Sequence, residues 1–183
     1  PTASPKPTPI PMPKSTPQPT RSPKPTSSPV PAGIYPEGQY KVGVDIPAGE
    51  YVLLLSEADK GGMFIVSTDA NAENVIYYDY FHGNSIATVK NGEYLKLSSC
   101  YAKKFSSVKS LNTSGEGMFK VGTHIPAGEY KLTTTEDDIG GMYTVSGDSR
   151  KEEVIAWDYF KGSAYVQVKN GQYLILNGCK IIE

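Results

Sequence analysis

The chain has 183 residues, 15 prolines, two cysteines and a formal net charge of −1, and this composition excludes several classes of protein. Two cysteines are too few for a disulfide scaffold, and with only two histidines beside them they do not make a plausible tetrahedral zinc set. No stretch approaches the roughly 18–20 apolar residues that a membrane-spanning helix needs.

Residues 1–36 differ in composition from the rest of the chain. They hold every proline except Pro47 and Pro126, with four basic residues and no acidic one, which leaves residues 37–183 with a net charge of −5. Proline lacks an amide donor and pushes the preceding residue out of the α region, so this segment is predicted to be an extended Pro/Thr-rich linker. The sequence shows no signal peptide and no initiator methionine, so any membrane anchor is expected upstream of Pro1.

The remainder of the chain is a duplication. Residues 37–102 align with residues 116–181 at a constant offset of 79, without a gap, and about half of the aligned positions are identical. Such a repeat predicts two copies of one module, over 37–102 and 116–183, joined by a connection over 103–115. A unit of 66 residues buries only a marginal core, so the two copies are expected to pack on each other.

Turn signals divide each copy into short β-prone runs. The hexapeptide Ile-Pro-Ala-Gly-Glu-Tyr contains Gly49 in the first copy and Gly128 in the second, and Lys-Asn-Gly begins at Lys90 and Lys169. Glycine permits positive φ in a turn, and Asn-Gly between apolar runs is a strong hairpin signal. The first copy is therefore predicted to be an all-β sandwich or barrel-like module of about six strands, over 40–42, 51–55, 63–67, 75–81, 86–89 and 94–97.

The aromatic run over 75–81 is the best functional candidate. Strand alternation places Tyr78 and Tyr80 on one face, and it places Trp157 and Tyr159 on the equivalent face of the second copy. Two interpretations remain open. The rings fill the core of a small protein, or they form an exposed platform that binds sugars or a partner chain.

Two acidic residues and two cysteines accompany this pattern. Asp79 and Asp158 alternate with the aromatics, where an acid is disfavoured, so we expect each to accept hydrogen bonds from loop amides or a tyrosine hydroxyl, or else to contact ligand. Cys100 and Cys179 occupy equivalent places in the last strand of each copy. They are expected to be buried free thiols, since equivalent residues meet only across a symmetry axis.

No catalytic pattern is present. His82 aligns with Lys161 and His124 aligns with Asp45, so neither histidine belongs to the shared pattern. The chain has no Gly-x-Ser-x-Gly elbow, no His-Glu-x-x-His and no phosphate-binding glycine loop. We therefore predict a protein that is not an enzyme and needs no cofactor. The repeats are net acidic and carry no basic stripe, so nucleic acid is not a predicted partner.

One loop has the alternating oxygen groups of a calcium site. Asp69, Asn71 and Glu73 are spaced as ligands can be, but the second copy has Arg150 at the middle position, where a cation would be repelled. A solvated loop is the preferred interpretation, and no metal site is predicted.

The run from Gly38 to Tyr51, Gly-Gln-Tyr-Lys-Val-Gly-Val-Asp-Ile-Pro-Ala-Gly-Glu-Tyr, resembles a repeat common in secreted and surface-attached proteins of Gram-positive bacteria. The second copy, from Gly117 to Tyr130, matches the same pattern except for His124 at the Asp position. The resemblance covers both repeats and implies a location outside the cell. It implies no activity and no functional residues.

The sequence supports two functional hypotheses. The first is a non-catalytic, extracellular cell-surface interaction or structural module, held away from the envelope by its linker. The second is a carbohydrate-binding or cell-wall-polymer-binding module that uses the aromatic strip repeated in both units. The expected partner is a cell-wall polysaccharide or a surface protein.

Overall fold

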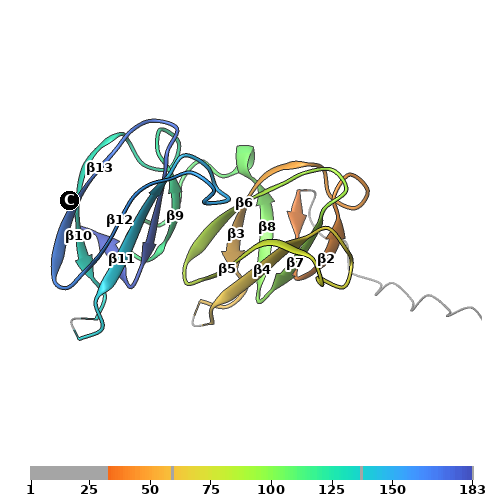
Figure 1. The fold of residues 1–183 in the computed structure, drawn as a ribbon, viewed down its shortest axis with the longest axis horizontal. Coiled ribbons are helices and arrows are strands. Elements are labelled where there is room, and N and C mark those ends of the chain that lie inside the picture. Colours follow the sequence, from red (N-terminus) through yellow and green to blue (C-terminus); the bar gives the residue numbers. More distant parts are fainter. Residues whose placement is uncertain (1–32, 59, 137, 183) are drawn as a thin grey trace, which may run out of the picture.

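The computed structural model describes residues 33–58, 60–136 and 138–182, so the predicted linker lies almost entirely outside the described residues. This part of the chain is all-β, with strands arranged in four small antiparallel sheets (Figure 1). Its single helical element is one 3-10 turn, η1 (Phe105–Ser107). Over the described residues, no helix has the length and apolar character needed to cross a bilayer.

The first repeat and its flanking residues supply eight strands. They form two sheets with the orders β2-β7-β4-β5 and β1-β8-β3-β6. The strands are β1 (Ile34–Tyr35), β2 (Gly38–Lys41), β3 (Gly49–Leu55), β4 (Gly62–Ser67), β5 (Val75–Phe81), β6 (Asn84–Val89), β7 (Tyr94–Ser98) and β8 (Cys100–Lys104).

The second repeat supplies seven strands in the same sequence of elements. Its sheets have the orders β12-β11-β14-β9 and β13-β10-β15, so β12 takes the place of β5 and β13 the place of β6. The strands are β9 (Gly117–Lys120), β10 (Gly128–Thr134), β11 (Gly141–Ser146), β12 (Val154–Phe160), β13 (Ser163–Val168), β14 (Tyr173–Asn177) and β15 (Cys179–Ile181).

Each repeat has its own apolar core. In the first repeat, buried side chains such as Phe64 and Leu95 form one cluster, and in the second repeat Phe119 and Leu174 belong to another. Because successive side chains of a strand point to opposite faces, every second residue of these strands enters a core. Full burial of one such side chain stabilises the fold by about 1.5–3 kcal/mol.

All six strands predicted for the first repeat are present, with boundaries shifted by a few residues. Gly49 and Gly128 have φ of +146° and +158°, so the positive φ expected of these glycines is confirmed, at the first residue of β3 and of β10. The separate strand β8 was not resolved by the sequence pattern. It follows β7 after Ser99 alone, whose φ of +57° redirects the chain from one sheet to the other.

Candidate functional site

The aromatic residues singled out in the sequence lie on the outer faces of β5 and β12. Each of these strands lies at the edge of its sheet. The exposed fractions are 68% for Tyr78, 57% for Tyr80, 66% for Trp157 and 54% for Tyr159. The core interpretation is therefore wrong for these four rings. Other side chains of these strands point inward, and Phe81 and Phe160 at their ends are buried.

Neighbouring strands extend each aromatic pair into a broader surface. In the antiparallel register Tyr78 faces Ile65 and Tyr80 faces Met63, both on β4. On β11, Thr144 and Met142 take the corresponding places beside Trp157 and Tyr159. Directly opposed side chains on one face of a sheet lie within contact distance of each other. We call the two surfaces, Tyr78 with Tyr80 and Trp157 with Tyr159, the aromatic faces.

The glycine pairs at the start of β4 and β11, the strands beside β5 and β12, each seat one tyrosine ring. A β-carbon at Gly61 would overlap the side chain of Tyr80, and one at Gly140 would overlap Tyr159. The Tyr159 hydroxyl also donates a hydrogen bond to the carbonyl of Ile139. The Gly-Gly pairs that mark a break in the sequence are thus also what allows a ring to lie close to the backbone. The position of Tyr80 and Tyr159 in the aromatic faces is therefore set by the neighbouring backbone.

Asp79 and Asp158 are not part of the aromatic faces, because alternation directs them to the other side of their strands. The Asp79 carboxylate accepts hydrogen bonds from Ser85 Oγ at 3.0 Å and from Lys151 Nζ at 2.9 Å. These donors are neither the loop amides nor the tyrosine hydroxyl that we expected. Asp158 is exposed. The two equivalent acids therefore have different surroundings, since Lys151 belongs to the second repeat.

Among the described residues, three salt bridges join the two repeats, and none of them was predicted from the sequence. Each places an acid of the first repeat against a base of the second. The pairs are Glu50 with Lys120 at 3.4 Å, Glu93 with Arg150 at 2.8 Å and Asp79 with Lys151 at 2.9 Å. Two of the pairs carry a sequence signal, divergence between the copies, because Arg150, Lys151 and Glu93 align with Asn71, Ala72 and Gln172. The pair of Glu50 and Lys120 carries none, because both residue types are the same in the two copies.

Arg150 is the most enclosed of these bases. Its side chain is 7% exposed and its Nη2 donates to both carboxylate oxygens of Glu93, at 3.0 and 2.8 Å. Nε donates to the carbonyl of Thr88, and the guanidinium lies 5.0 Å from the centre of the Tyr77 ring. A guanidinium held by a carboxylate, a carbonyl and an aromatic ring is fixed in both position and orientation.

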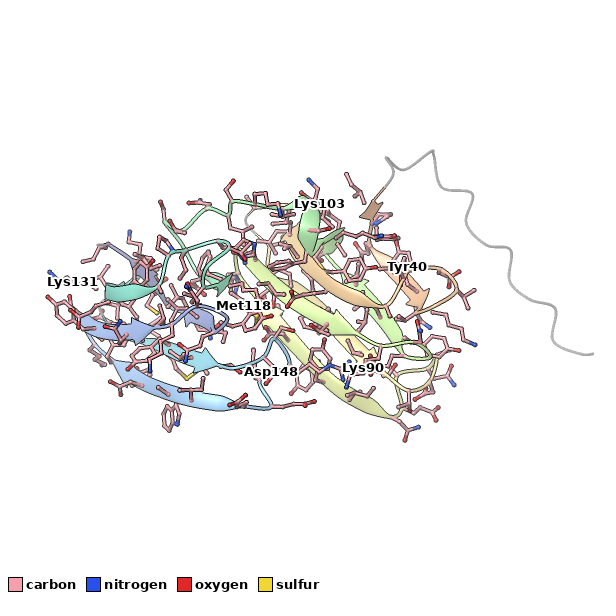
Figure 2. The ribbon with its side chains drawn as sticks, turned by 90° about the horizontal axis from the view of Figure 1, so that it is seen from above. Tyr40, Lys90, Lys103, Met118, Lys131 and Asp148 are labelled. Atoms are coloured by element: carbon pink, nitrogen blue, oxygen red, sulfur yellow. The ribbon has the colours of Figure 1, made fainter. Side chains whose placement is uncertain are left out.

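A small apolar cluster lies beside the salt bridges. Ile86 of β6 is fully buried against three side chains of the second repeat, with Phe105 of η1 packed at its margin. The three are Met118, Tyr173 and Ile175. Met118 is labelled near the middle of the molecule in Figure 2, where the two halves meet. The repeats are thus joined by an apolar centre flanked by ion pairs.

The loop with calcium-like spacing uses its oxygen atoms internally. The Asp69 carboxylate accepts hydrogen bonds from the amides of Asn71, Glu73 and Asn74, and these bonds hold its pKa below the usual range. Asp148 accepts equivalent bonds from amides of its own loop. Over the described residues no group of three or more His, Cys, Asp or Glu side chains is placed to hold a metal ion.

Cys100 and Cys179 are buried and free, as expected. Each thiol donates a weak hydrogen bond to a backbone carbonyl, Cys100 to Met63 at 3.5 Å and Cys179 to Met142 at 3.4 Å. Burial raises the pKa of both thiols, to about 11 for Cys179. The thiolate is the reactive form, so these cysteines are structural rather than nucleophilic.

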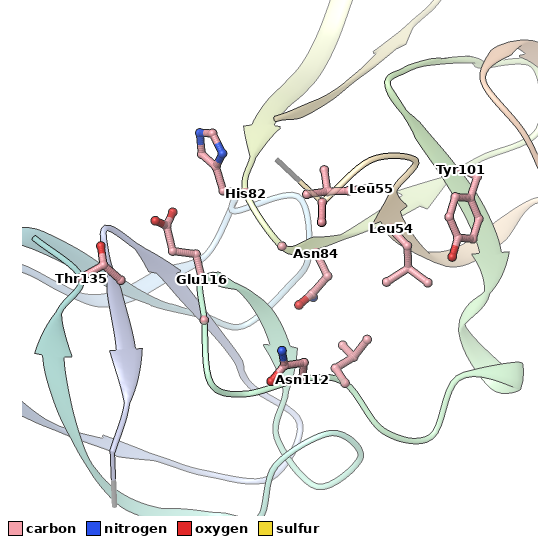
Figure 3. Close-up of a pocket in the computed structure, with 12 residues that line it drawn as sticks. Leu54, Leu55, His82, Asn84, Tyr101, Asn112, Glu116 and Thr135 are labelled. Carbon is pink, nitrogen blue, oxygen red and sulfur yellow. The ribbon is translucent and has the colours of Figure 1, made fainter. Parts of the chain in front are cut away.

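A cleft of about 560 Å³ lies between the repeats (Figure 3). Leu54, Leu55 and Tyr101 of the first repeat give it an apolar side, and Glu116 and Thr135 contribute polar groups from the second. It contains none of the residues of the aromatic faces.

Comparisons with protein-family models, curated proteins and solved structures returned no match. Function is therefore inferred from the residues and their geometry.

Proposed function

We propose that this protein is a non-catalytic cell-surface interaction module that binds an extended polymer, such as a cell-wall polysaccharide, through its two aromatic faces. The observation that supports this proposal is that two equivalent aromatic positions in each repeat are more than half exposed. Aromatic rings that only filled a core would be buried. A binding platform on a duplicated strand is instead expected to be exposed once in each repeat.

The chemistry of the rings suits a sugar polymer. Tyrosine and tryptophan are flat, rigid and amphipathic, so they offer a large contact area for the apolar face of a sugar at little cost in conformational entropy. The Gly61 and Gly140 positions reduce that cost further by allowing Tyr80 and Tyr159 to lie close to the backbone.

The arrangement of the repeats favours a long ligand over a small molecule. The strands β5 and β12 lie along the same border of the molecule in Figure 2. The salt bridges and apolar cluster between the repeats hold the two aromatic faces in a defined relation. Two weak sites on one body raise the apparent affinity for a repeating polymer through effective concentration.

The rest of the proposal rests on the sequence. We place the protein outside a Gram-positive cell because of the resemblance carried by the run that contains Gly38 and Tyr51. We regard residues 37–102 and 116–183 as two modules, and residues 1–36 as the linker that presents them.

The test is co-sedimentation with insoluble Gram-positive cell-wall polysaccharide. Trp157→Ala and Tyr78→Ala should each weaken binding roughly 100-fold, the lower end of avidity gains, because either change leaves a single site. Tyr165→Ala is the matched control, since Tyr165 is 62% exposed on β13, outside both aromatic faces. Trp157 is the only tryptophan, so quenching of its fluorescence by the polymer gives an independent reading. Equal binding by all four proteins would overturn the proposal.

A protein partner is the second candidate, and the edge position of β5 and β12 favours it. An edge strand presents unpaired amides and carbonyls to which another strand can add. Such a partner would slow hydrogen exchange of the outward-facing amides of β12, whereas a polysaccharide bound to the rings would leave them in exchange.

A further inference from the structure

The contact between the two repeats is head to tail. The first repeat uses the outer face of β3 and β6, where Glu50 and Ile86 lie, and the second uses the outer face of β9 and β14, where Lys120 and Tyr173 lie. Two copies of one module that meet through different faces leave the complementary face of each one open. The open faces are the outer side of β2 and β7 at one end and the outer side of β10 and β13 at the other.

One set of polar residues spans this contact. Lys120 Nζ donates to the Tyr173 hydroxyl at 2.6 Å and lies 4.7 Å from the centre of that ring. The Tyr173 hydroxyl in turn donates to the Glu50 carboxylate, to which Lys120 is also paired. Lysine and tyrosine come from one repeat and glutamate from the other. We call these three residues the Lys-Tyr-Glu set.

The same three residue types are present at the two open ends. Lys41 and Tyr94 align with Lys120 and Tyr173, and the Lys41 ammonium already lies 5.7 Å from the centre of the Tyr94 ring. Glu129 aligns with Glu50 and is exposed on β10. The basic and aromatic part of a second set therefore lies at one end of the molecule, and its acid lies at the other.

The apolar residues of the internal contact have different counterparts at both open ends. Tyr165, 62% exposed, replaces Ile86, and Lys96 replaces Ile175 on the opposite face. Stacked in the same way, the two ends would place an ammonium against an aromatic ring, which is an attractive pair. An isoleucine pair has become a cation–ring pair. The end formed by β10 and β13 has also acquired Lys131 in place of the buried Val52, and its repulsion of Lys96 weakens the contact without removing the Lys41 and Glu129 pair.

We propose that the protein associates with a second copy of itself, head to tail, with Lys41 and Tyr94 of one molecule meeting Glu129 of the next. The internal contact supplies the geometry, and the open ends supply the complementary charges. The Arg150 and Lys151 salt bridges have no counterpart, because Asn71, Ala72 and Gln172 replace the charged residues. The association between molecules is therefore weaker than the contact within one, reversible and dependent on concentration. It does not depend on polymer binding.

The experiment is sedimentation velocity on the full chain over a range of concentrations. The weight-average sedimentation coefficient of the wild-type protein should rise with concentration and fall back when salt is added, because exposed ion pairs are screened. Lys41→Glu and Glu129→Lys should each abolish the rise, since like charges then meet at every contact. Lys109→Glu and Glu57→Lys, exposed on other surfaces, are the matched controls and should associate as the wild type does.

Mixing the two variants gives the decisive measurement. Lys41→Glu protein still carries Glu129, and Glu129→Lys protein still carries Lys41, so in an equimolar mixture every contact between unlike molecules has opposite charges. Association should return in the mixture and in the double variant. A wild-type coefficient that does not change with concentration overturns the proposal, and so does a mixture that stays as monomeric as its components. Circular dichroism of each variant checks that the exposed substitutions leave the fold intact.

Discussion

At the scale of single residues, the positions that matter most for joining the repeats are those where the duplication has diverged. Arg150 stands where the first copy has Asn71, and Glu93 stands where the second copy has Gln172. Conversely, Glu93 and Gln172 share one local task, since each side chain accepts a hydrogen bond from the amide of the lysine that begins its Lys-Asn-Gly turn. Glu93 accepts this bond and also binds Arg150, so the ion pair depends on two differences between the copies, Glu in place of Gln and Arg in place of Asn.

Replacing Arg150 with Ala should lower the free energy of unfolding by about 3 kcal/mol, because it leaves a nearly buried carboxylate without its partner. Asn71→Ala is the matched control, because the equivalent position in the first repeat is exposed, and it should change stability by less than about 0.5 kcal/mol. Urea denaturation followed by circular dichroism measures both. Equal effects of the two substitutions would show that the Arg150 contacts contribute little.

His124 should make stability sensitive to mild acid. Its Nδ1 accepts a hydrogen bond from the Lys120 amide at 3.2 Å, as Asp45 does from Lys41, and burial lowers its pKa below the ordinary value of 6.5. The unfolded chain then binds the proton more readily, so this contribution is complete above pH 6.5 and is lost as pH falls through the lowered pKa of the folded state.

The check is the melting temperature measured above and below pH 6.5. His124→Asp restores the residue type of the first repeat and should remove the loss in this range, because an aspartate titrates at lower pH. Parallel curves for the wild type and this variant would assign the acid sensitivity to other groups.

At the scale of strands, the elements predicted from the sequence are those whose ends are set by local backbone restrictions. The strands bounded by Gly, Pro and Asn-Gly were predicted because those residues restrict the backbone locally. The break between β7 and β8 was missed in the first copy, where Ser99 holds a φ of +57° that the sequence does not announce. The second copy has Gly178 at that position, with φ of +63°, and comparing the copies there could have located the break.

The exposure of the aromatic faces could not be derived in the same way. Alternation assigns Tyr78 and Tyr80 to a common face, but it does not say which face is covered. Which face is covered depends on where the second sheet of the repeat packs, and the strands of that sheet are distant in the sequence. The inner sides of β4 and β7 supply buried side chains such as Phe64 and Leu97, so the core is filled without the outer rings of β5.

Gly49→Val should lower the melting temperature by several degrees. A β-carbon at Gly49 would meet no heavy atom within 4 Å, so the cost comes from the φ of +146° and not from a clash. A branched residue in that region costs roughly 1 kcal/mol or more. Gly115→Val is the control, because Gly115 also has open space around it and has no positive φ. Equal melting temperatures for the two variants would mean that the positive φ of Gly49 is not what makes glycine favourable there.

At the scale of the whole molecule, the question is whether the repeats unfold together. Each has its own core, and a unit of this size is only marginally stable alone, so the contact between them contributes a large share of the stability of each. The apolar cluster around Ile86 and the Arg150 ion pair are the parts of that contact removed from solvent. We therefore expect the wild-type protein to unfold in one cooperative transition.

Ile86→Asp should divide that transition into two. The substitution places a carboxylate, without a partner, among Met118, Tyr173 and Ile175, which costs several kcal/mol unless the repeats separate and let water reach it. Tyr165→Asp is the matched control, because it makes the same kind of change at the equivalent, exposed position of the second repeat. Differential scanning calorimetry should show two transitions for Ile86→Asp and one for Tyr165→Asp and the wild type. Because Ile86 lies on the outer face of β6 and not in the core of the first repeat, each repeat keeps its own core in the variant. A single transition at lower temperature for Ile86→Asp would mean that neither repeat remains folded without the other.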